Sequence, residues 1–547
     1  MNAPEFSVVT PVYNTPPAVL RETIASVQRQ TVTSWELILV DDCSPDPAVR
    51  EVLREAAAQD PRIRVIERAE NGHIVAASND GVDAARADFI ALLDHDDLLT
   101  PDALEQVRRV VLAEPEVDYI YSDEDKIDES GARFAEFRKP SWSPEKLRGH
   151  MYTCHLSVLR TSCVRGVGGF RPGAEGSQDH DLVLRVTEVA RKVVHIPKVL
   201  YHWRVLEGSA AGDPDAKPYA WLAGRAAVQA HLDRVGIDGT VALGPGRGTY
   251  RIHRRLHPDV RVSVVIPTRG ADGLIWGERR SFVLEAVRSL LDRPDHENVE
   301  IVVVHDADTP PRVLDALAAV GGARLELVPH DRPFNFSEKC NRGVTSSYGD
   351  AIVLLNDDVE ISCDGFLTQL VAPLYEDGVG MTGANLTMAD TTVQHAGLAV
   401  DDRLAHLFAD GRRSLRHPGP FLVRNHLRHL VGSFMAVNRE VSGVSAAALA
   451  IRRSTYEEVG GMSEVFPVNF GDVDLSMKVA ASGHRILWIA AATAYHFEAG
   501  SREPSVDAAE VQAFMKRWRV LPTYDRHLPT QPLLSTGARV PARLPYQ

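Results

Sequence analysis

The chain has 547 residues, 44% of them hydrophobic and 24% charged, and its formal net charge is -14. Two or more domains are expected because one hydrophobic core rarely serves a chain of this length, and the negative charge disfavours nonspecific binding to nucleic acid. Five cysteines show no metal-ligand spacing, which predicts free thiols. No signal peptide or run of about 18 apolar residues is evident, so the sequence predicts a cytoplasmic protein without a membrane span.

The first half alternates short apolar runs with helical patterns. Strands are predicted at 6–10, 35–40, 62–66 and 89–93, and helices at 17–30, 47–59 and 74–85. This alternation predicts an α/β fold with a mainly parallel sheet and helices on both faces. In such sheets ligands bind beyond the carboxyl ends of the strands. Asp41-Asp42 and Asp94-His95-Asp96 both follow predicted strands and are therefore candidate binding residues.

The second half shows the same alternation. Strands are predicted at 261–266, 299–304, 325–328 and 351–355, and helices at 285–291 and 312–320. Glycine and proline punctuate the region between the halves, and the loop at 244–248 has no strand before it, so we interpret it as a connection rather than a phosphate loop. We predict domains at 1–245 and 260–547, the latter with a C-terminal extension, joined by a linker at 246–259.

Five motifs of the first half return in the second in the same order, with spacings that differ as expected for insertions in loops. They are a Val-Val-x-Pro strand, an acidic strand end, a Leu-Leu-x-x-Asp segment, an Asp-x-Asp-Leu helix start and a Tyr-His pair. The pairs of segments are 8–11 and 264–267, 36–42 and 300–306, 92–96 and 354–358, 179–182 and 472–475, and 201–202 and 495–496.

The acidic motifs each have two readings. Two carboxylates at Asp94 and Asp96 can turn toward one divalent cation and its phosphate oxygens, whereas Asp in this position is also common where a helix begins. Asn356 replaces the first carboxylate in the second half, and an amide can still accept a hydrogen bond. Asp179 and Asp472 each begin an apolar helical run, where the helix dipole favours a carboxylate whether or not it acts as a general base.

A lone histidine is more often structural than a metal ligand. His202 and His496 recur, however, beside two acidic motifs, which favours the ligand interpretation.

Together these motifs resemble family 2 glycosyltransferases of the GT-A fold, the type that acts in bacterial surface-polysaccharide and O-antigen synthesis. The resemblance covers nearly the whole chain and implies two tandem Rossmann-like domains that bind nucleotide sugars. It implies donor-binding roles for Pro11, Asp41, Asp42, Asn71, Asn79, Asp94, Pro267, His305, Asp306, Asn341, Asn356 and Asp357. It implies a Mn²⁺ or Mg²⁺ site in each domain, with the ligands Asp96, His202, Asp358 and His496.

The resemblance also implies that Asp179 and Asp472 are the general bases of an inverting transfer. The family usually has Glu before this Asp, whereas Gln178 and Gly471 stand there; His305 replaces the first Asp of its pair, which leaves the second nucleotide preference open. The stretches after Asp96 and Asp358 are expected to shape the acceptor sites. Trp142, Gln178, His395 and His406 are acceptor candidates.

The function expected from the sequence is a bifunctional glycosyltransferase that moves sugars from UDP-, dTDP- or GDP-sugars to a glycan or lipid-linked glycan. Two alternatives stay open: one half is a noncatalytic copy, or the chain is a glycan-binding scaffold without catalysis. Scattered basic residues at 502–543 allow peripheral attachment at the inner face of the cell membrane. Donor sugar, linkage and oligomeric state are not determined by the sequence.

Overall fold

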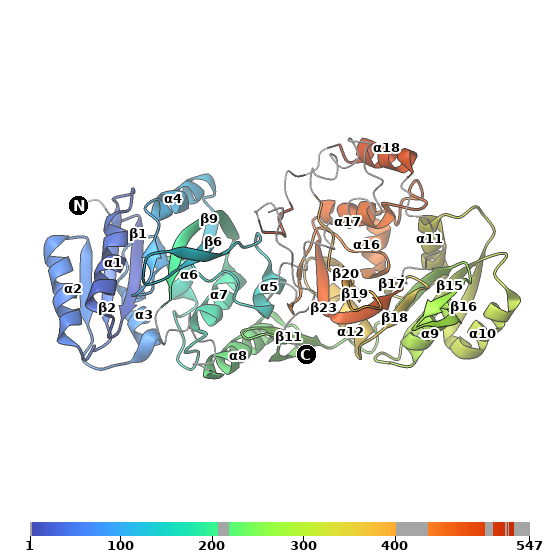
Figure 1. The fold of residues 1–547 in the computed structure, drawn as a ribbon, viewed down its shortest axis with the longest axis horizontal. Helices are drawn as coiled ribbons and strands as arrows, with labels where there is room; N and C mark the ends of the chain where they lie inside the picture. Colours follow the sequence, from blue (N-terminus) through green and yellow to red (C-terminus); the bar gives the residue numbers. More distant parts are fainter. Residues whose placement is uncertain are drawn as a thin grey trace.

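The structure is a computed structural model and describes residues 3–205, 218–400, 436–497, 507–519, 522 and 525–529. Two α/β halves lie side by side along the long axis of the molecule, with the green segment that contains α8 and β11 running beneath their junction (Figure 1). The acceptor candidate His406 and most of 502–543 lie outside the described residues.

The first half is built on a nine-stranded sheet with the path β3-β2-β1-β4-β8-β6-β9-β5, and β7 pairs with β6. Its strands are β1 (Phe6–Val12), β2 (Trp35–Asp41), β3 (Ile63–Glu67), β4 (Phe89–Leu92), β5 (Leu98–Leu99), β6 (Val117–Ile127), β7 (Arg133–Phe137), β8 (Ser157–Arg160) and β9 (Lys192–Arg204). Strands β1 to β4 are parallel, and β8 pairs antiparallel to β4.

The second half repeats this topology in a ten-stranded sheet with the path β16-β15-β12-β17-β22-β19-β23-β18. Its strands are β12 (Val262–Thr268), β15 (Val299–Asp306), β16 (Leu325–His330), β17 (Ala351–Leu355), β18 (Val359–Ile361), β19 (Val379–Thr387), β20 (Val393–His395), β21 (Arg439–Glu440), β22 (Ala448–Arg452) and β23 (Arg485–His496). Each strand on the path has its counterpart at the same place in the first sheet. The repeat seen in the sequence is thus a repeat of the fold.

Helices cover both faces of each sheet. The first half has α1 (Pro17–Gln28), α2 (Pro47–Gln59), α3 (His73–Ala84), α4 (Ala103–Ala113), α5 (Pro144–Gly149), α6 (Thr161–Gly166), α7 (Gln178–Val189) and α8 (Pro218–Val235). The second has α9 (Phe282–Leu291), α10 (Pro311–Gly321), α11 (Phe336–Ser346), α12 (Phe366–Val371), α16 (Arg453–Glu458), α17 (Gly471–Ala481) and α18 (Ala508–Arg517), with 3₁₀ turns at Gly322–Arg324 and Ala372–Tyr375.

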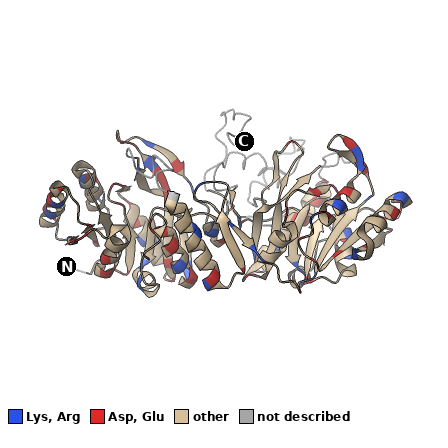
Figure 2. Cartoon of the chain, turned by 90° about the horizontal axis from the view of Figure 1, so that it is seen from below, with Lys and Arg blue, Asp and Glu red and all other residues tan. Residues whose placement is uncertain are grey.

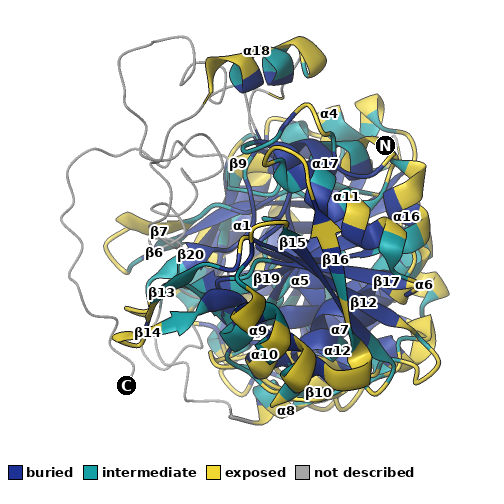
Figure 3. Ribbon diagram, turned by 90° about the vertical axis from the view of Figure 1, so that its right-hand side faces the viewer, coloured by how far each residue is buried: buried dark blue, intermediate teal, exposed yellow. Residues whose placement is uncertain are grey.

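Each sheet has a hydrophobic core on both of its faces. Successive residues of a strand pack into opposite cores, because strand side chains alternate with a period of two. In the first sheet, Val8 packs with α1, α2 and α4, while Val9 packs with α3, α6 and α7. In the second, Val264 packs with α9, α10 and α12, while Val265 packs with α11, α16 and α17. Buried strands lie between exposed outer helices in Figure 3. The predicted α/β fold class and the early strands and helices of both halves are confirmed.

The segment predicted as a linker is structured and lies at the junction. It contains β11 (Tyr250–Arg254), which forms a hairpin with β10 (Gly239–Leu243). The Arg254 guanidinium is 2% exposed and pairs with Glu145 of the first half at 2.7 Å and with Glu376 of the second. Arg148 also reaches both carboxylates, at 3.0 and 2.8 Å. These buried charges join the halves, whereas acidic and basic residues mix over the outer surface (Figure 2).

Candidate active site

In the first half, the end of β2 brings two carboxylates to the crevice beyond the parallel strands. Asp41 is fully buried and pairs with Arg50 at 3.1 Å. Asp42 accepts hydrogen bonds from Arg68 at 2.7 Å and from the backbone N–H of Gly72 at 2.9 Å. The chain order reverses between β1 and β4, and ligands of open α/β sheets bind at such a switch point.

The same strand end in the second half has different charge partners. The register of β15 on β12 and β16 places His305 at the position of Asp41 and His330 at that of Arg68. Asp306, the counterpart of Asp42, accepts from the ammonium of Lys339 on α11 at 2.8 Å. Buried His330 lies 3.8 Å from Asp306. The second carboxylate is therefore kept as Asp306, but its cationic partner is Lys339 on α11, whereas the partner of Asp42 is Arg68 after β3.

The loop after β4 contains the acidic cluster of the first half. Atoms of Asp94, Asp97 and His155 lie within 4.8 Å of one another, close enough to hold one metal ion. Two carboxylates and an imidazole suit a divalent cation such as Mn²⁺. Burial raises the pKa of Asp97 well above its usual value, and the charges of Asp94 and Asp96 raise it further. Burial lowers the pKa of His155, but Glu124, Asp94 and Asp97 raise it to about 9, so its proton offsets part of this charge. A divalent cation that displaces this proton would relieve the repulsion, and the donor set can hold one.

Asp179, at the start of α7, lies against this cluster. Its pKa is raised to about 6, first by burial and then by the negative charge of Asp94, with His155 acting in the opposite direction. The amide of Gln178 donates to Asp179 Oδ2 at 3.1 Å, and its oxygen accepts from Gly176. The structure therefore brings Asp179, Gln178 and Asp94 close together.

In the second half, Asp358 and His496 meet, as predicted. Asp358 Oδ1 lies 3.0 Å from His496 Nε2, while His496 Nδ1 lies 2.5 Å from Gln394 Oε1. Because the amide oxygen only accepts, Nδ1 carries a proton, and Nε2 faces the carboxylate: it donates to Asp358 when the ring is protonated and offers a lone pair to a cation when the ring is neutral. An oxygen and a nitrogen so placed fit a divalent cation between them. Asn356 Nδ2 lies 3.4 Å from the same Nε2.

Two further predicted residues complete this site. Asp357 has a pKa of about 6, raised by burial and by Asp358, and it accepts from Thr268 at 2.6 Å. Asp472 accepts from the backbone of Ala446 at 3.2 Å, and burial raises its pKa. The predicted acceptor residue His395 lies next to this base because its Nε2 accepts from the N–H of Ser445 at 3.2 Å.

His202 is placed differently from His496. It forms no ion pair with Asp96; instead its Nδ1 lies 2.5 Å from Asp125, and its buried Nε2 has no hydrogen-bond partner. The pairings of Leu98 with His202 and of Val359 with His496 shift β23 by one residue relative to β9. His496 therefore corresponds to Trp203, and the two histidines project from opposite faces of their strands.

Other predicted residues form hydrogen bonds or packing contacts that support the structure around the site. Asn71 donates to the carbonyl of Asp42 at 3.1 Å. Both amide atoms of Asn79 bond the backbone of Phe170, and Asn341 makes the matching contacts with Met462. Pro11 and Pro267 occupy equivalent positions near the ends of β1 and β12. Trp142 is half-buried against the first-half core just before α5.

Sequence reasoning missed Asp97, His155, Lys339 and Gln394. Asp97 and Gln394 are neighbours of residues that were singled out, so adjacency could have suggested them. Lys339 stands two residues before Asn341, a predicted donor-binding residue. His155 gave no signal, because Ala447 stands at its position in the second half.

Comparison with known proteins identifies the family. The model of "Glycosyl transferase family 2" matches residues 7–163 and 263–443, one segment in each half. The chain belongs to glycosyltransferase family 2. The matched segments include the β1, β2 and β4 strand ends and their counterparts in the second half.

Two relatives align across nearly the whole chain, and a third aligns with part of it. An uncharacterized protein, y4gI, of Sinorhizobium fredii is 41% identical over 95% of this chain and 56% of its own length. The O-antigen biosynthesis protein RfbC of Myxococcus xanthus is 34% identical over 96% of this chain and 40% of its own length. A chondroitin synthase of Pasteurella multocida is 31% identical over 38% of this chain and 21% of its own. The chain thus spans about half the length of the first two relatives or less. None of the helices described is long and apolar enough to cross a membrane.

Proposed function

We propose that each half of this family 2 glycosyltransferase is an inverting transferase with its own donor site and general base. The observation that carries the proposal is the repetition of one topology with polar residues at the same strand ends. Asp94 and Asp179 interact electrostatically in the first half, and Asp358 and His496 lie 3.0 Å apart in the second. A noncatalytic copy would have no need to keep Asp358, Asp472 and His496.

The reaction proposed for the first half begins at Asp179. Its carboxylate takes the proton of an acceptor hydroxyl, and that oxygen attacks the anomeric carbon from the face opposite the nucleotide. The bond from this carbon to the diphosphate oxygen breaks, and the nucleoside diphosphate leaves with the bonding electrons. Gln178 orients the base through its hydrogen bond to Oδ2. Asp472 has the same role in the second half. General-base assistance is typically worth 10² to 10⁴ in rate.

A Mn²⁺ or Mg²⁺ ion fits both sites. Asp94, Asp97 and His155 would hold it in the first half, together with the predicted ligand Asp96. Asp358 and His496 would hold it in the second. The cation would offset the negative charge that develops on the departing diphosphate. His202 pairs with Asp125 on the face of β9 opposite to Tyr201, whose hydroxyl donates to Asp97, so we leave His202 out of this donor set.

The donors we propose are UDP-, dTDP- or GDP-sugars, whose nucleotide would contact Asp42 in the first half and Asp306 in the second. The two sites are expected to prefer different nucleotides. The ion pair between Asp41 and Arg50 in the first half is replaced by His305 and Leu314 at the equivalent positions of the second half. The acceptor is a growing glycan or a lipid-linked glycan at the inner face of the cell membrane. The names of two relatives, an O-antigen biosynthesis protein and a chondroitin synthase, support a role in bacterial polysaccharide synthesis.

Release of nucleoside diphosphate from a panel of nucleotide sugars tests this function, with Mn²⁺ or Mg²⁺ and oligosaccharide acceptors present. The wild type is expected to turn over at least one donor, and the Asp179→Asn/Asp472→Asn double variant none. Binding of glycans by the wild type without turnover of any donor would instead favour the noncatalytic scaffold. Equal turnover by the wild type and the double variant would show that neither Asp179 nor Asp472 acts as a general base.

A further inference from the structure

The second half has a β-hairpin at its site that the first half lacks. In the first half four residues separate β1 from α1, whereas thirteen separate β12 from α9. This longer connection forms β13 (Asp272–Ile275) and β14 (Glu278–Ser281). It leaves the sheet at Thr268, whose side chain hydrogen-bonds Asp357 of the site. The hairpin therefore starts at the edge of the donor crevice.

The hairpin turn holds a tryptophan in an unfavourable conformation. Trp276 and Gly277 are the two turn residues, with φ values of 51° and 83°. Positive φ at both positions is typical of a type I′ turn, in which Asn-Gly is strongly preferred and a bulky residue at the first position is strained. Such strain persists where the side chain has a use. The question is what the indole of Trp276 contacts.

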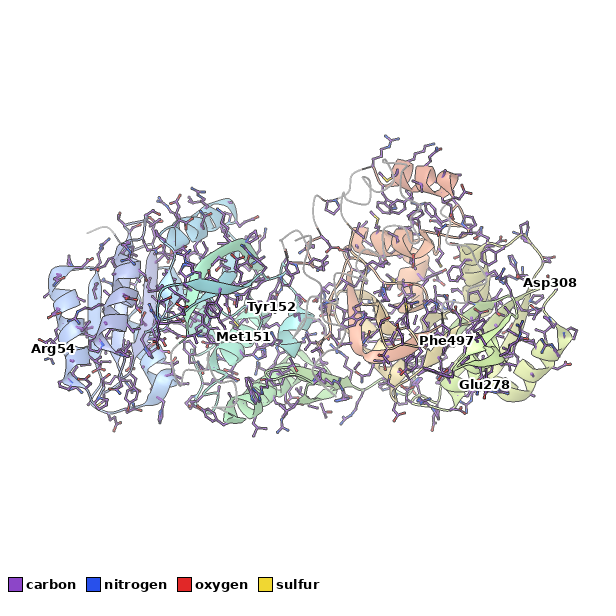
Figure 4. All side chains as sticks on the ribbon, viewed as in Figure 1. Arg54, Met151, Tyr152, Glu278, Asp308 and Phe497 are labelled. Atoms are coloured by element: carbon purple, nitrogen blue, oxygen red, sulfur yellow. The ribbon has the colours of Figure 1, made fainter. Side chains whose placement is uncertain are left out.

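The indole reaches the strand that contains the proposed metal ligand. Its Nε1 donates to Glu360 Oε2 at 2.9 Å, and its ring stands edge-to-face with Tyr495 and Phe497, at centroid distances of 4.8 and 5.3 Å. Tyr495 and Phe497 flank His496 on both sides in the sequence. Figure 4 places Phe497 beside Glu278 of the hairpin. The ring itself is 48% exposed.

The strand register shows which face of the sheet the indole occupies. Ile361 pairs with Ala494, and both enter the core under α9 and α12. Glu360 and Tyr495, one residue away on each strand, therefore point to the opposite face. The α11, α16 and α17 layer covers that face, and α17 begins with the proposed base Asp472. The exposed indole thus lies at the strand end that carries Asp358 and His496, on the face of the sheet that α17 covers.

We propose that Trp276 is a specificity-determining residue of the second half, with its open indole face packing on the pyranose ring of a bound sugar. The proposal rests on the function proposed above. The hydrogen bond to Glu360 and the contacts with Tyr495 and Phe497 fix the indole plane before the sugar arrives, so little side-chain freedom is lost on binding. The sugar is the one that is transferred or the one that accepts it.

The test uses transfer by the second half alone, measured in an Asp179→Asn background. Trp276→Asn is the informative variant, because Asn suits the first position of a type I′ turn and should keep the hairpin folded. Trp276→Phe keeps an aromatic plane, and Tyr348→Asn removes an exposed aromatic ring elsewhere, 59% exposed, as the matched control. The probes are UDP-, dTDP- and GDP-hexoses, the corresponding free nucleoside diphosphates and an oligosaccharide acceptor.

Trp276→Asn is expected to raise KM for one sugar substrate by up to about 10-fold, the size of an aromatic contact. Its melting temperature and its Kd for the free nucleoside diphosphate should stay unchanged, and Trp276→Phe should recover most of the loss. The KM that rises, donor or acceptor, identifies the sugar. Unchanged KM values would overturn the proposal. So would an equal loss of affinity for the sugar substrate and the free nucleotide together with a lower melting temperature. In either case, turnover by the Asp179→Asn parent would leave the proposed function standing. Absence of turnover in the parent and the wild type would refute the function, and this inference with it.

Discussion

Replacing Arg254 with methionine is expected to destabilise the junction between the two halves. The side chain is 2% exposed and pairs with Glu145, which is fully buried, and with Glu376, which is 10% exposed. Removing one member of a buried ion pair leaves an unpaired charge and costs about 3–5 kcal/mol. Arg148 still reaches both carboxylates, so the lower end, about 3 kcal/mol, applies. For units of this size that lowers the melting temperature by about 6–12 °C.

Thermal unfolding followed by circular dichroism or calorimetry measures this change. Arg54→Met is the control, because Arg54 pairs with Glu67 on the outer surface of the first half, with 67% of its side chain exposed, at the far left of Figure 4. Such an exposed pair adds little to stability. A drop for Arg254→Met no larger than that for Arg54→Met would refute the view that buried charges hold the halves together.

Three further changes test the site. With the second half silenced by Asp472→Asn, transfer should decline with falling pH at a value above the usual carboxylate range, because Asp179 must be ionised to accept a proton and burial is the main cause of its raised pKa; a decline centred near pH 4 in a pH–rate profile would contradict this. Lys339→Met should weaken nucleoside diphosphate binding to the second half by about 10-fold or more in calorimetry, since Asp306 loses its cation. Arg332→Met, at an exposed pair, should not. Asn341→Ala should lower stability by about 1–3 kcal/mol in urea unfolding, because the buried hydroxyl of Tyr456 and the backbone carbonyl of Met462 lose the Asn341 amide as hydrogen-bond partner; an unchanged midpoint would argue against it.

The early strands and the acidic strand ends could be predicted because their signals are local. Apolar runs mark β1, β2 and β4, and the polar residues that follow each run must lie at one sheet edge when the strands are parallel. The nearness of Asp358 to His496 was implied instead by the family resemblance. These elements recur in both halves, which made each signal easier to recognise.

Long-range geometry explains what the sequence could not give. His155 reaches the acidic cluster from β8, far along the chain, and has no histidine counterpart in the second half. The Tyr-His match concealed a one-residue difference in register, which turns His202 and His496 to opposite faces. The hairpin that carries Trp276 consists of two four-residue strands with mixed polarity, too short for a period to be read.

Each half is proposed to catalyse transfer with its own base. The most direct test of this claim is nucleoside diphosphate release from the donor panel by Asp179→Asn and Asp472→Asn, each compared with the wild type at fixed Mn²⁺. Each variant is expected to lose one activity by about 10²-fold or more and to keep the other. Loss of all turnover in one variant and none in the other would show that a single half is catalytic and contradict the claim.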